Sequence, residues 1–544
     1  MYITGHVPFG NGGTLIRVET DIRRGIPGID ISGLAEGAVK EARERVRAAF
    51  RNSGLDFPLD RILINLAPAG IKKEGAALDL PMALSVMAAA GLVPGMAALP
   101  EQLMVLGELE LSGRVRPVRG VLAAAAAGLA EGIRFFIVPK ENETEAAILL
   151  GSRANPAADG GKSGSIQAVQ FCSVSSLEEA AHALVLLTGT GTFPPPFRKV
   201  PALEIPPCCG DFAEVRGQGR YKRALEIAAA GGHNLLVFGA PGSGKTMLAR
   251  RLPSIMPPLS MEEAVEVTRI YSLAGQDRGF AGNGGLSLAS PFRAPHHSAS
   301  LEGILGGGRS VRPGEISLAH FGALFLDEAP EFRVNVLQAL REPLEDRCLT
   351  IVRAEGPVHL PAEFQLIMAA NACPCGMLGG RGECLCAADD IRRHWKKFGG
   401  ALLDRVELRV PGRNGSAGTG PPEESSAVIR LRVMRAVEIQ RRRFASIPAR
   451  EGRPRRNARM GPGHTGRFCP LQEGAARAFR RAVDTLAFSG RACQGILKTA
   501  RTIADLEEKD AIGADHILEA VQHRRLGDDP HDIIGGIAGL RGEA

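Results

Sequence analysis

The sequence predicts an α/β protein built around a P-loop nucleotide-binding core and followed by a helical region, and three observations support this class. A glycine-rich loop stands between an apolar run and a helical pattern within 234–252. Two further apolar runs, 324–326 and 364–370, end in polar residues. A long helical pattern then begins after a Gly-, Pro- and Ser-rich break at 411–426. Apolar runs that alternate with helical patterns are typical of a parallel sheet covered by helices.

The composition is that of a folded protein with several domains. The chain has 544 residues, 44% hydrophobic and 23% charged, which excludes wholesale disorder and gives a prior of about three or four domains. The uncharged stretch 81–100 is mostly Ala, Gly and Pro, so it predicts a buried helix and a turn rather than a membrane span. The N-terminal residues lack the basic-then-apolar order of a signal peptide, and ten cysteines are too few for a disulfide scaffold. We therefore expect a cytoplasmic protein without membrane segments.

Polar and Pro-rich stretches predict where the domains begin and end. The predicted parts are an N-terminal domain at 1–190, a Pro-rich linker at 191–210, an ATPase domain at 211–411, a linker at 412–424, a helical domain at 425–525 and a flexible tail at 526–544. The charge is concentrated in the helical domain, which holds 21 Lys and Arg against ten Asp and Glu. This excess indicates either a solvated surface or a polyanionic partner.

Eight consecutive residues form the candidate ATP-binding loop. They are Gly239, Ala240, Pro241, Gly242, Ser243, Gly244, Lys245 and Thr246. They match the pattern G-x(4)-G-K-[ST], in which backbone N–H groups converge on the phosphates at a helix N-terminus. Lys245 is expected to neutralise the β- and γ-phosphates, and the Thr246 hydroxyl is expected to bind Mg²⁺.

Two acidic residues close the next apolar run and complete the predicted catalytic site. Asp327 is expected to hold Mg²⁺ through water, and Glu328 is expected to polarise the water that attacks the γ-phosphate. The third apolar run ends at Asn371, a position suited to sensing the γ-phosphate. The order of these elements resembles that of the AAA+ ATPases, in which Asn371 corresponds to sensor 1.

Two arginines complete the resemblance to AAA+ ATPases. The element Leu402–Val406 resembles the L-L-x-R-[FIV] sequence of the magnesium-chelatase and minichromosome-maintenance branch, where the arginine, here Arg405, reaches into a neighbouring subunit's site. Arg491 resembles sensor 2 at the start of a helix of the C-terminal lid, and Arg501 is the alternative for this role. An ordinary surface arginine is the alternative for each position. An arginine supplied in trans implies a ring, most often a hexamer.

Further motifs narrow the resemblance to the magnesium-chelatase-like ATPases of the competence protein ComM/YifB type. They are Pro291–His297, Gly306–Gly308, Pro313–His320, Asn371–Gly376, Leu402–Arg405 and Thr499–Leu506. The resemblance covers nearly the whole chain and implies a hexameric DNA helicase that drives branch migration during natural transformation. Two positions depart from the family pattern: Ala372 stands where proline is usual, and the aromatic residue before the Leu-Leu-Asp-Arg element is Trp395.

The N-terminal domain resembles the Lon protease domain, a ribosomal S5-type α+β fold, in Gly107–Gly120 and Phe135–Lys140. Lon proteases use a serine nucleophile activated by a lysine. Alignment on the two motifs places Ala77 at the serine position and Leu122 at the lysine position. The resemblance therefore implies a scaffold that binds or aligns DNA or neighbouring subunits, without proteolysis.

Four cysteines cluster directly after the predicted sensor 1 residue. They are Cys373, Cys375, Cys384 and Cys386. Their C-x-C-x8-C-x-C spacing predicts a structural zinc site with four thiolate ligands, although the C-x-C pairs are tighter than the usual C-x2-C. Four unligated, reduced cysteines are the alternative.

Basic residues in two predicted pore insertions are the candidate DNA contacts. In this AAA+ branch, insertions corresponding to about 285–320 and to the hairpin 350–360 point into the pore of the ring. The predicted phosphate contacts are Arg353, Arg309 and Arg312, with Arg293, His296 and His297 as further candidates, and the two histidines form a structural pair in the alternative interpretation. With one Trp and three Tyr in the chain, DNA would be held through its phosphates rather than by base stacking.

The sequence thus predicts an ATP-driven motor that translocates on forked, branched or single-stranded DNA. The alternative is a chelatase-type motor that remodels a protein partner. An ATP-dependent protease is disfavoured by Ala77 and Leu122. The arginine-rich stretch 441–467, with nine arginines and one acid, would add phosphate contacts in the DNA motor.

Overall fold

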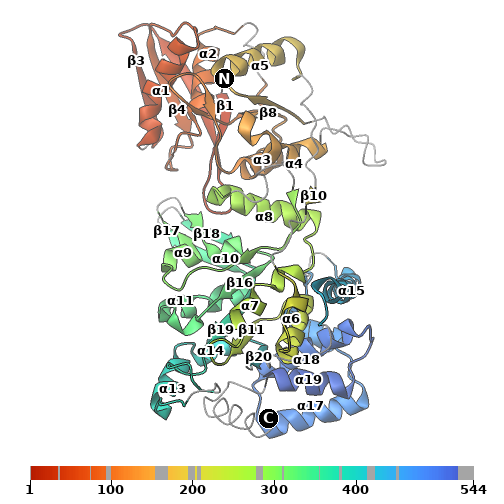
Figure 1. The fold of residues 1–544 in the computed structure, drawn as a ribbon. Coiled ribbons are helices and arrows are strands. Elements are labelled where there is room, and N and C mark those ends of the chain that lie inside the picture. The colour runs from red at the N-terminus through yellow and green to blue at the C-terminus, as the bar shows by residue number, and fades with distance from the viewer. Residues whose placement is uncertain are drawn as a thin grey trace.

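The computed structural model arranges the chain in three regions along one long axis (Figure 1). The N-terminal region lies at one end, the central sheet in the middle, and the C-terminal helices at the other end. The structure describes residues 2–34, 37–73, 75–93, 100–153, 169–193, 203–204, 210–276, 286–308, 311–353, 356–378, 383–412, 423–448 and 452–524. Most of the predicted linkers and the whole of the predicted tail at 526–544 lie outside these ranges.

The N-terminal region is built on a seven-stranded mixed sheet with the order β3-β4-β2-β1-β5-β8-β9. Its strands are β1 (Tyr2–Val7), β2 (Thr14–Arg23), β3 (Gly28–Ser32), β4 (Arg61–Ala67), β5 (Leu103–Val105), β8 (Phe135–Pro139) and β9 (Gln170–Val174), with a separate hairpin of β6 (Glu108–Leu109) and β7 (Val115–Arg116). In β4 the side chains of Ile62, Ile64 and Leu66 are buried while those between them are more exposed. This alternation places one face of the strand in the core.

Five helices pack with this sheet. They are α1 (Ala38–Asn52), α2 (Asp79–Ala89), α3 (Val121–Ala130), α4 (Glu143–Arg153) and α5 (Leu177–Thr190). Helix α2 is buried over Asp79–Ala88, as expected for the apolar stretch that begins at 81. Among the described helices of the whole chain, none combines the length and apolar character that crossing a membrane requires.

The central region is a five-stranded parallel sheet with the order β13-β16-β19-β11-β20. Its strands are β11 (Leu235–Phe238), β13 (Phe292–Arg293), β16 (Ala323–Leu326), β19 (Gln365–Ala370) and β20 (Leu408–Pro411). Every residue of β11, β16 and β19 is buried, because helices and loops cover both faces. The predicted α/β class with a parallel sheet is therefore confirmed.

The helices of the central region surround this sheet. They are α6 (Gly219–Gly231), α7 (Lys245–Ala249), α8 (Met261–Ala274), α11 (Val334–Ala339), α12 (Arg341–Asp346), α13 (Ala388–Lys396) and α14 (Gly400–Leu403). Alternate residues of β11 contribute to two different cores, Leu235 and Val237 to one and Leu236 and Phe238 to the other. The phosphate-loop strand is thus packed on both faces.

Two insertions project from the central sheet toward the N-terminal region (Figure 1). The first contains β12 (Leu286–Ser287), α9 (Leu301–Leu305), β14 (Gly306–Gly307), β15 (Arg312–Pro313) and α10 (Glu315–Leu318). The second is the antiparallel hairpin of β17 (Cys348–Arg353) and β18 (Gly356–Pro361). The hairpin predicted at 350–360 is therefore present, and its turn residues 354–355 lie outside the described ranges.

The C-terminal region is entirely helical where it is described. Its helices are α15 (Ser426–Ala445), α16 (Pro462–Phe468), α17 (Glu473–Leu486), α18 (Gly490–Leu506) and α19 (Ala514–Arg524). Apolar residues of α15, α18 and α19, among them Val433, Ile503 and Ile517, share one core with α6 of the central region. This shared core fixes the C-terminal helices against the sheet.

Helix α8 joins the N-terminal region to the central region (Figure 1). A capping box starts this helix, since the Ser260 hydroxyl accepts from Glu263 N and the Glu263 carboxylate accepts from Ser260 N. At its other end the Ser272 hydroxyl accepts from Gly120 N at 2.9 Å and also bonds the Glu145 carboxylate. The two regions are therefore linked by specific polar contacts.

Candidate nucleotide site and its surroundings

The candidate phosphate loop leaves the carboxyl end of β11 and turns into α7. Gly244, just before the helix, has a φ of 76°, which residues with side chains rarely adopt. Gln218 donates from Nε2 to Ser243 O at 2.9 Å, and the buried Tyr221 hydroxyl donates to Lys245 O at 3.0 Å. Two side chains of the preceding segment thus hold the loop in shape.

Lys245 folds back onto the loop that it follows. Its Nζ donates to Gly239 O and Ala240 O, each at 2.8 Å, and lies 3.3 Å from Asn371 Oδ1. Burial lowers the pKa of Lys245. The ammonium group is therefore held by neutral oxygens at the point where the sequence places the nucleotide phosphates, and it can exchange these acceptors for phosphate oxygens.

The two predicted catalytic acids lie at the end of β16, beside the phosphate loop. The Thr246 hydroxyl donates to Asp327 Oδ1 at 3.1 Å. Glu328 has a φ of 49°, in the left-handed region that costs a non-glycine residue of the order of 1 kcal/mol or more. Its carboxylate is largely exposed, and Oε2 lies 3.8 Å from Nδ1 of His297. This backbone conformation fixes the direction of the Glu328 side chain, and His297 lies beside it.

Asn371 lies at the end of β19, between the phosphate loop and α13. Its backbone O accepts from His394 Nε2 at 3.1 Å, and the next carbonyl, Ala372 O, accepts from Trp395 Nε1 at 3.0 Å. The Trp395 ring also meets the Phe238 ring edge-on, with centroids 5.4 Å apart. The two positions that depart from the family pattern, Ala372 and Trp395, are therefore in direct contact, and they anchor the predicted sensor residue.

Arg405 and Arg491 lie together rather than at separate places. Both bind the carboxylate of Glu345 at the end of α12, Arg491 at 2.8 Å. The Ser489 hydroxyl, which caps α18, also lies 3.2 Å from Asp404 Oδ1. Slight burial opposes ionisation of Glu345, but the two guanidinium groups outweigh it and lower its pKa. Sequence reasoning missed Glu345, because a single acid in the Pro-Leu-Glu-Asp run carries no motif of its own.

Arg501, the alternative for sensor 2, is buried in the interior of the C-terminal region. Its side chain is 1% exposed and lies 3.1 Å from Asp505 Oδ1. It also donates to Asp510 O at 2.6 Å and to Lys509 O. A buried arginine with these partners stabilises the turn after α18. Between the two candidates, the geometry favours Arg491 for a role at the surface.

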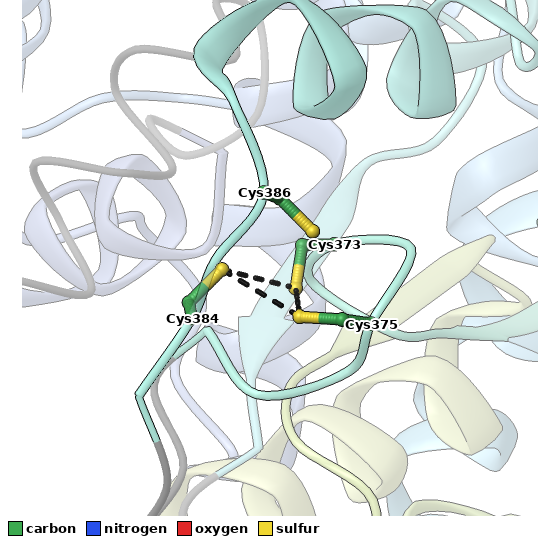
Figure 2. Close-up of side chains that lie close together, drawn as sticks. All are labelled: Cys373, Cys375, Cys384 and Cys386. Carbon is green, nitrogen blue, oxygen red and sulfur yellow. Dashed lines mark hydrogen bonds between the residues drawn. The ribbon is translucent and has the colours of Figure 1, made fainter.

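The four clustered cysteines converge directly after Asn371 (Figure 2). Their sulfur atoms all lie within 4.8 Å of one another, and three of the Sγ–Sγ distances are 3.4, 3.6 and 3.7 Å. A tetrahedral zinc with bonds of about 2.3 Å would require sulfurs about 3.8 Å apart. The arrangement fits this ion, and loop residues 379–382 between the cysteine pairs lie outside the described ranges.

The cysteine loop packs against the phosphate loop. Gly376 has a φ of 78°, and a Cβ placed there would lie 2.8 Å from Cγ of Pro241. Leu378 N donates to Cys373 Sγ at 3.4 Å, the kind of bond that supports a thiolate. A metal held here would therefore fix the segment that borders the nucleotide site on this side.

We expect one zinc per chain in protein purified without chelators. Cys375→Ser removes an exposed ligand, so elemental analysis should show the zinc content falling to a small fraction of that of the unsubstituted protein. Cys172→Ser is the matched control, because this half-buried cysteine lies in the N-terminal sheet away from the cluster. Absence of zinc from the unsubstituted protein, or an unchanged content in Cys375→Ser, would contradict the site.

Some of the predicted pore residues are exposed and could contact DNA, whereas others are held in ion pairs within the chain. Arg353 and Arg312 are exposed, and Arg353 donates to Gly308 O at 2.9 Å. Arg309 lies outside the described residues. Arg293 makes a two-pronged ion pair with Glu315, both bonds 2.7 Å, so the expectation that it contacts DNA is not supported.

The two adjacent histidines of the first insertion form a pair. Their ring centroids are 4.1 Å apart, and His296 Nδ1 lies 2.8 Å from the Ser298 hydroxyl. Since His297 also faces Glu328, the geometry favours the alternative in which the two histidines form a structural pair over the one in which they contact DNA. The approach of His297 to the predicted catalytic acid carries no sequence signal, because the residues lie 31 positions apart on different elements.

The arginine-rich stretch 441–467 does not form one basic face. Arg443 binds the fully buried carboxylate of Asp505, with one bond of 2.9 Å. Arg455 binds Glu263, the capping residue of α8, at 2.7 Å. These arginines hold the C-terminal region together and attach it to the central region, so only part of the predicted positive surface is available to a polyanion.

The N-terminal region lacks the side chains of a serine–lysine dyad at the aligned positions. Leu122 is fully buried in α3, and Ala77 lies half-buried just before α2. The nearby Lys73 is also fully buried and donates to Gly33 O at 2.7 Å and to Pro68 O. Lys73 is therefore a structural residue that satisfies backbone carbonyls.

Sequence profiles of the magnesium chelatase family match three parts of the chain. The profile of magnesium chelatase subunit ChlI matches residues 211–418. A second ChlI profile of Mg-chelatase matches 18–142, and the ChlI C-terminal profile matches 423–524. Together these three matches span the N-terminal, central and C-terminal regions described above.

Two relatives match this chain over nearly the whole length of both proteins. The chain is 40% identical to the protein YifB of Salmonella typhimurium over 520 residues, which cover 94% of each chain. It is 36% identical to the competence protein ComM of Haemophilus influenzae over 521 residues, covering 94% of this chain and 95% of ComM. A shorter match, 33% identity over 153 residues, joins 26% of this chain to 19% of the Lon protease of Salinispora arenicola.

Proposed function

The chain belongs to the magnesium-chelatase-like ComM/YifB family, and from this premise we propose that it is an ATP-driven motor that moves branched or forked DNA. The observation that carries the proposal is the convergence of three strand ends on one place: the phosphate loop after β11, Asp327 and Glu328 after β16, and Asn371 after β19. Carboxyl ends of adjacent parallel strands form the ligand sites of α/β proteins.

The residues at this point can carry out ATP hydrolysis. Lys245 binds the β- and γ-phosphates. Asn371, whose Oδ1 lies 3.3 Å from Lys245 Nζ, senses whether the γ-phosphate is present. The hard oxygens of Thr246 and Asp327, 3.1 Å apart, would hold Mg²⁺, which neutralises phosphate charge when bound. Glu328 orients and polarises the attacking water, with its side chain directed by the left-handed backbone and by His297.

The DNA part of the proposal rests on the two insertions. Arg353 and Arg312 are exposed cations on elements that project from the edge of the ATPase sheet. Exposed cations of this kind suit phosphate oxygens, so we expect contact with the DNA backbone and little sequence preference. The name of the relative from Haemophilus influenzae, a competence protein, agrees with a role on incoming DNA.

A synthetic four-way junction tests the function. We expect the full chain to bind the junction at low salt, to lose affinity steeply as salt rises, and to migrate the branch with ATP but not with a non-hydrolysable analogue. Glu328→Gln is the control that binds without moving the branch. If the assembled protein neither binds forked DNA at low salt nor moves the junction, the DNA motor is wrong and the chelatase-type motor acting on a protein partner replaces it.

A further inference from the structure

A cavity of about 480 Å³ lies where the N-terminal region meets the two insertions. On the N-terminal side it is lined by the turn between β1 and β2, by Ile71 and Lys72, by residues 75–77, by Glu108 and by residues 117–119. On the other side it is lined by the end of α8, by residues 311–313 and by Arg353. The cavity therefore exists only because the N-terminal region is placed against the ATPase region.

Close contacts on both sides hold the walls of this junction cavity. Gly10 approaches the hairpin so closely that a Cβ there would lie 2.2 Å from Cγ1 of Val358. Arg119 packs against Gly275 at the end of α8, where a Cβ would lie 2.6 Å from its Cδ. Both glycines have positive φ, so side chains are disfavoured there by conformation as well as by space.

The charge of the described lining is strongly positive. Lys72, Arg119, Arg312 and Arg353 contribute four cations, and Glu108 contributes one carboxylate. The three arginines are exposed, and within the described ranges none of them forms an ion pair. Loss of surrounding water and the like charge of Arg312 both lower the pKa of Arg119. The carboxylate of Glu108 opposes this lowering of the pKa and offsets one positive charge, and the remaining excess of cations is stabilised when an anion binds between them.

The remaining lining narrows the chemistry of that anion. Apart from the Thr14 hydroxyl, the polar side chains of the described lining are charged, and four of these five charged groups are cations, so phosphate oxygens match the lining. A volume of this size lies within the range of about 300–1,000 Å³ that holds small molecules, so one strand fits and a duplex does not. Ala77, aligned with the nucleophile of Lon, contributes a methyl group to the wall.

We infer that the junction cavity binds the phosphodiester backbone of a single DNA strand beside the hairpin β17–β18. This inference rests on the proposed DNA-motor function and assigns a role to the region that resembles a protease. The strand passes between Arg119 of the N-terminal region and Arg312 and Arg353 of the insertions. The strand thereby contacts the side of the domain that carries Ala77.

The test measures binding of a fluorescent thirty-residue oligothymidylate by the full chain, assembled with a slowly hydrolysed ATP analogue. Ala77→Asp places a carboxylate in the cavity wall, whereas Ala77→Ser changes the wall without changing its charge. Arg119→Gln removes one cation, and Arg116→Gln is its control on the same segment, because Arg116 pairs with Glu110 outside the cavity. Binding of inorganic tripolyphosphate to the same proteins is measured in parallel.

We expect Arg119→Gln and Ala77→Asp each to weaken oligothymidylate binding about fivefold or more at 0.1 M salt, and the two controls to bind normally. For a single strand, each phosphate contact adds about 0.7 to the slope with which the logarithm of the binding constant falls against the logarithm of the salt concentration. Arg119→Gln should therefore reduce this slope by about 0.7.

Three results separate the possibilities. If the unsubstituted protein does not bind the oligomer, the proposed function fails. If it binds and both variants bind equally well with the same salt slope, the cavity assignment is overturned while the function stands. If the variants lose tripolyphosphate binding but keep full affinity for the oligomer, the cavity is a site for small free anions and the DNA assignment is overturned.

Discussion

Glu328→Gln should reduce ATP turnover by about a hundredfold or more while leaving ATP binding intact. The amide keeps the size of the side chain and can occupy the same left-handed backbone position, φ 49°, but it cannot accept a proton from water. The hydrogen bonds of Lys245 go to Gly239 O, Ala240 O and Asn371 Oδ1, so the contacts that position the phosphate-binding group are kept when the charge of Glu328 is removed. The measurement is steady-state hydrolysis together with binding of a fluorescent ATP analogue.

Glu331→Gln is the matched control for this variant. Glu331 is exposed, lies three residues further along the same short helical turn, and carries the same charge. Lys245→Ala provides the opposite pattern, because it removes the cation that the loop directs at the phosphates and should abolish nucleotide binding itself. Normal turnover by Glu328→Gln would remove this residue from the water-activating role.

The sheet and the order of the strands around the nucleotide site could be predicted from the sequence because both are local signals. The apolar runs predicted at 234–238, 324–326 and 364–370 correspond to the buried parallel strands β11, β16 and β19. The glycine-rich loop follows β11, and the polar residues Asp327 and Asn371 follow β16 and β19. A strand that is buried on both faces must be apolar throughout, and this requirement is visible in the sequence alone.

The roles of individual charged side chains could not be predicted in the same way. Arg293 and Arg353 lie in neighbouring insertions, and the sequence makes both equally suited to bind DNA. In the structure Arg293 forms an ion pair with Glu315, whereas Arg353 donates only to the Gly308 carbonyl among the described residues. Which arginine finds an acid depends on residues brought together by the fold. The same reason explains why Glu345 was missed.

The junction cavity could not be predicted from the sequence either. Its lining comes from segments that are more than 200 residues apart, such as Lys72 and Arg312. The alignment of Ala77 with the Lon nucleophile indicated only what the domain lacks. Two of the cations that line the cavity, Arg312 and Arg353, lie on insertions of the central region.

Arg405→Ala should lower ATP turnover by about a thousandfold or more, as removal of an arginine finger does. Mixing this variant with Lys245→Ala protein should restore measurable activity. In a mixed ring, some interfaces combine an intact phosphate loop from the Arg405→Ala subunit with an intact arginine from its Lys245→Ala neighbour. The measurement is hydrolysis by the mixture compared with each parent, after co-assembly has been shown by pull-down of a tagged subunit.

The shared carboxylate makes this prediction sharper. Because Arg405 and Arg491 both bind Glu345, they lie on one patch of the surface and should face the same neighbouring site. Arg491→Ala should therefore also be rescued by Lys245→Ala, whereas a residue acting within its own subunit's site could not be. Arg393→Ala is the control, since this exposed arginine on α13 pairs with Asp390 and should keep full activity. If the co-assembled mixtures remain as inactive as their parents, both arginines act within their own subunit, and the proposed interface between subunits is wrong.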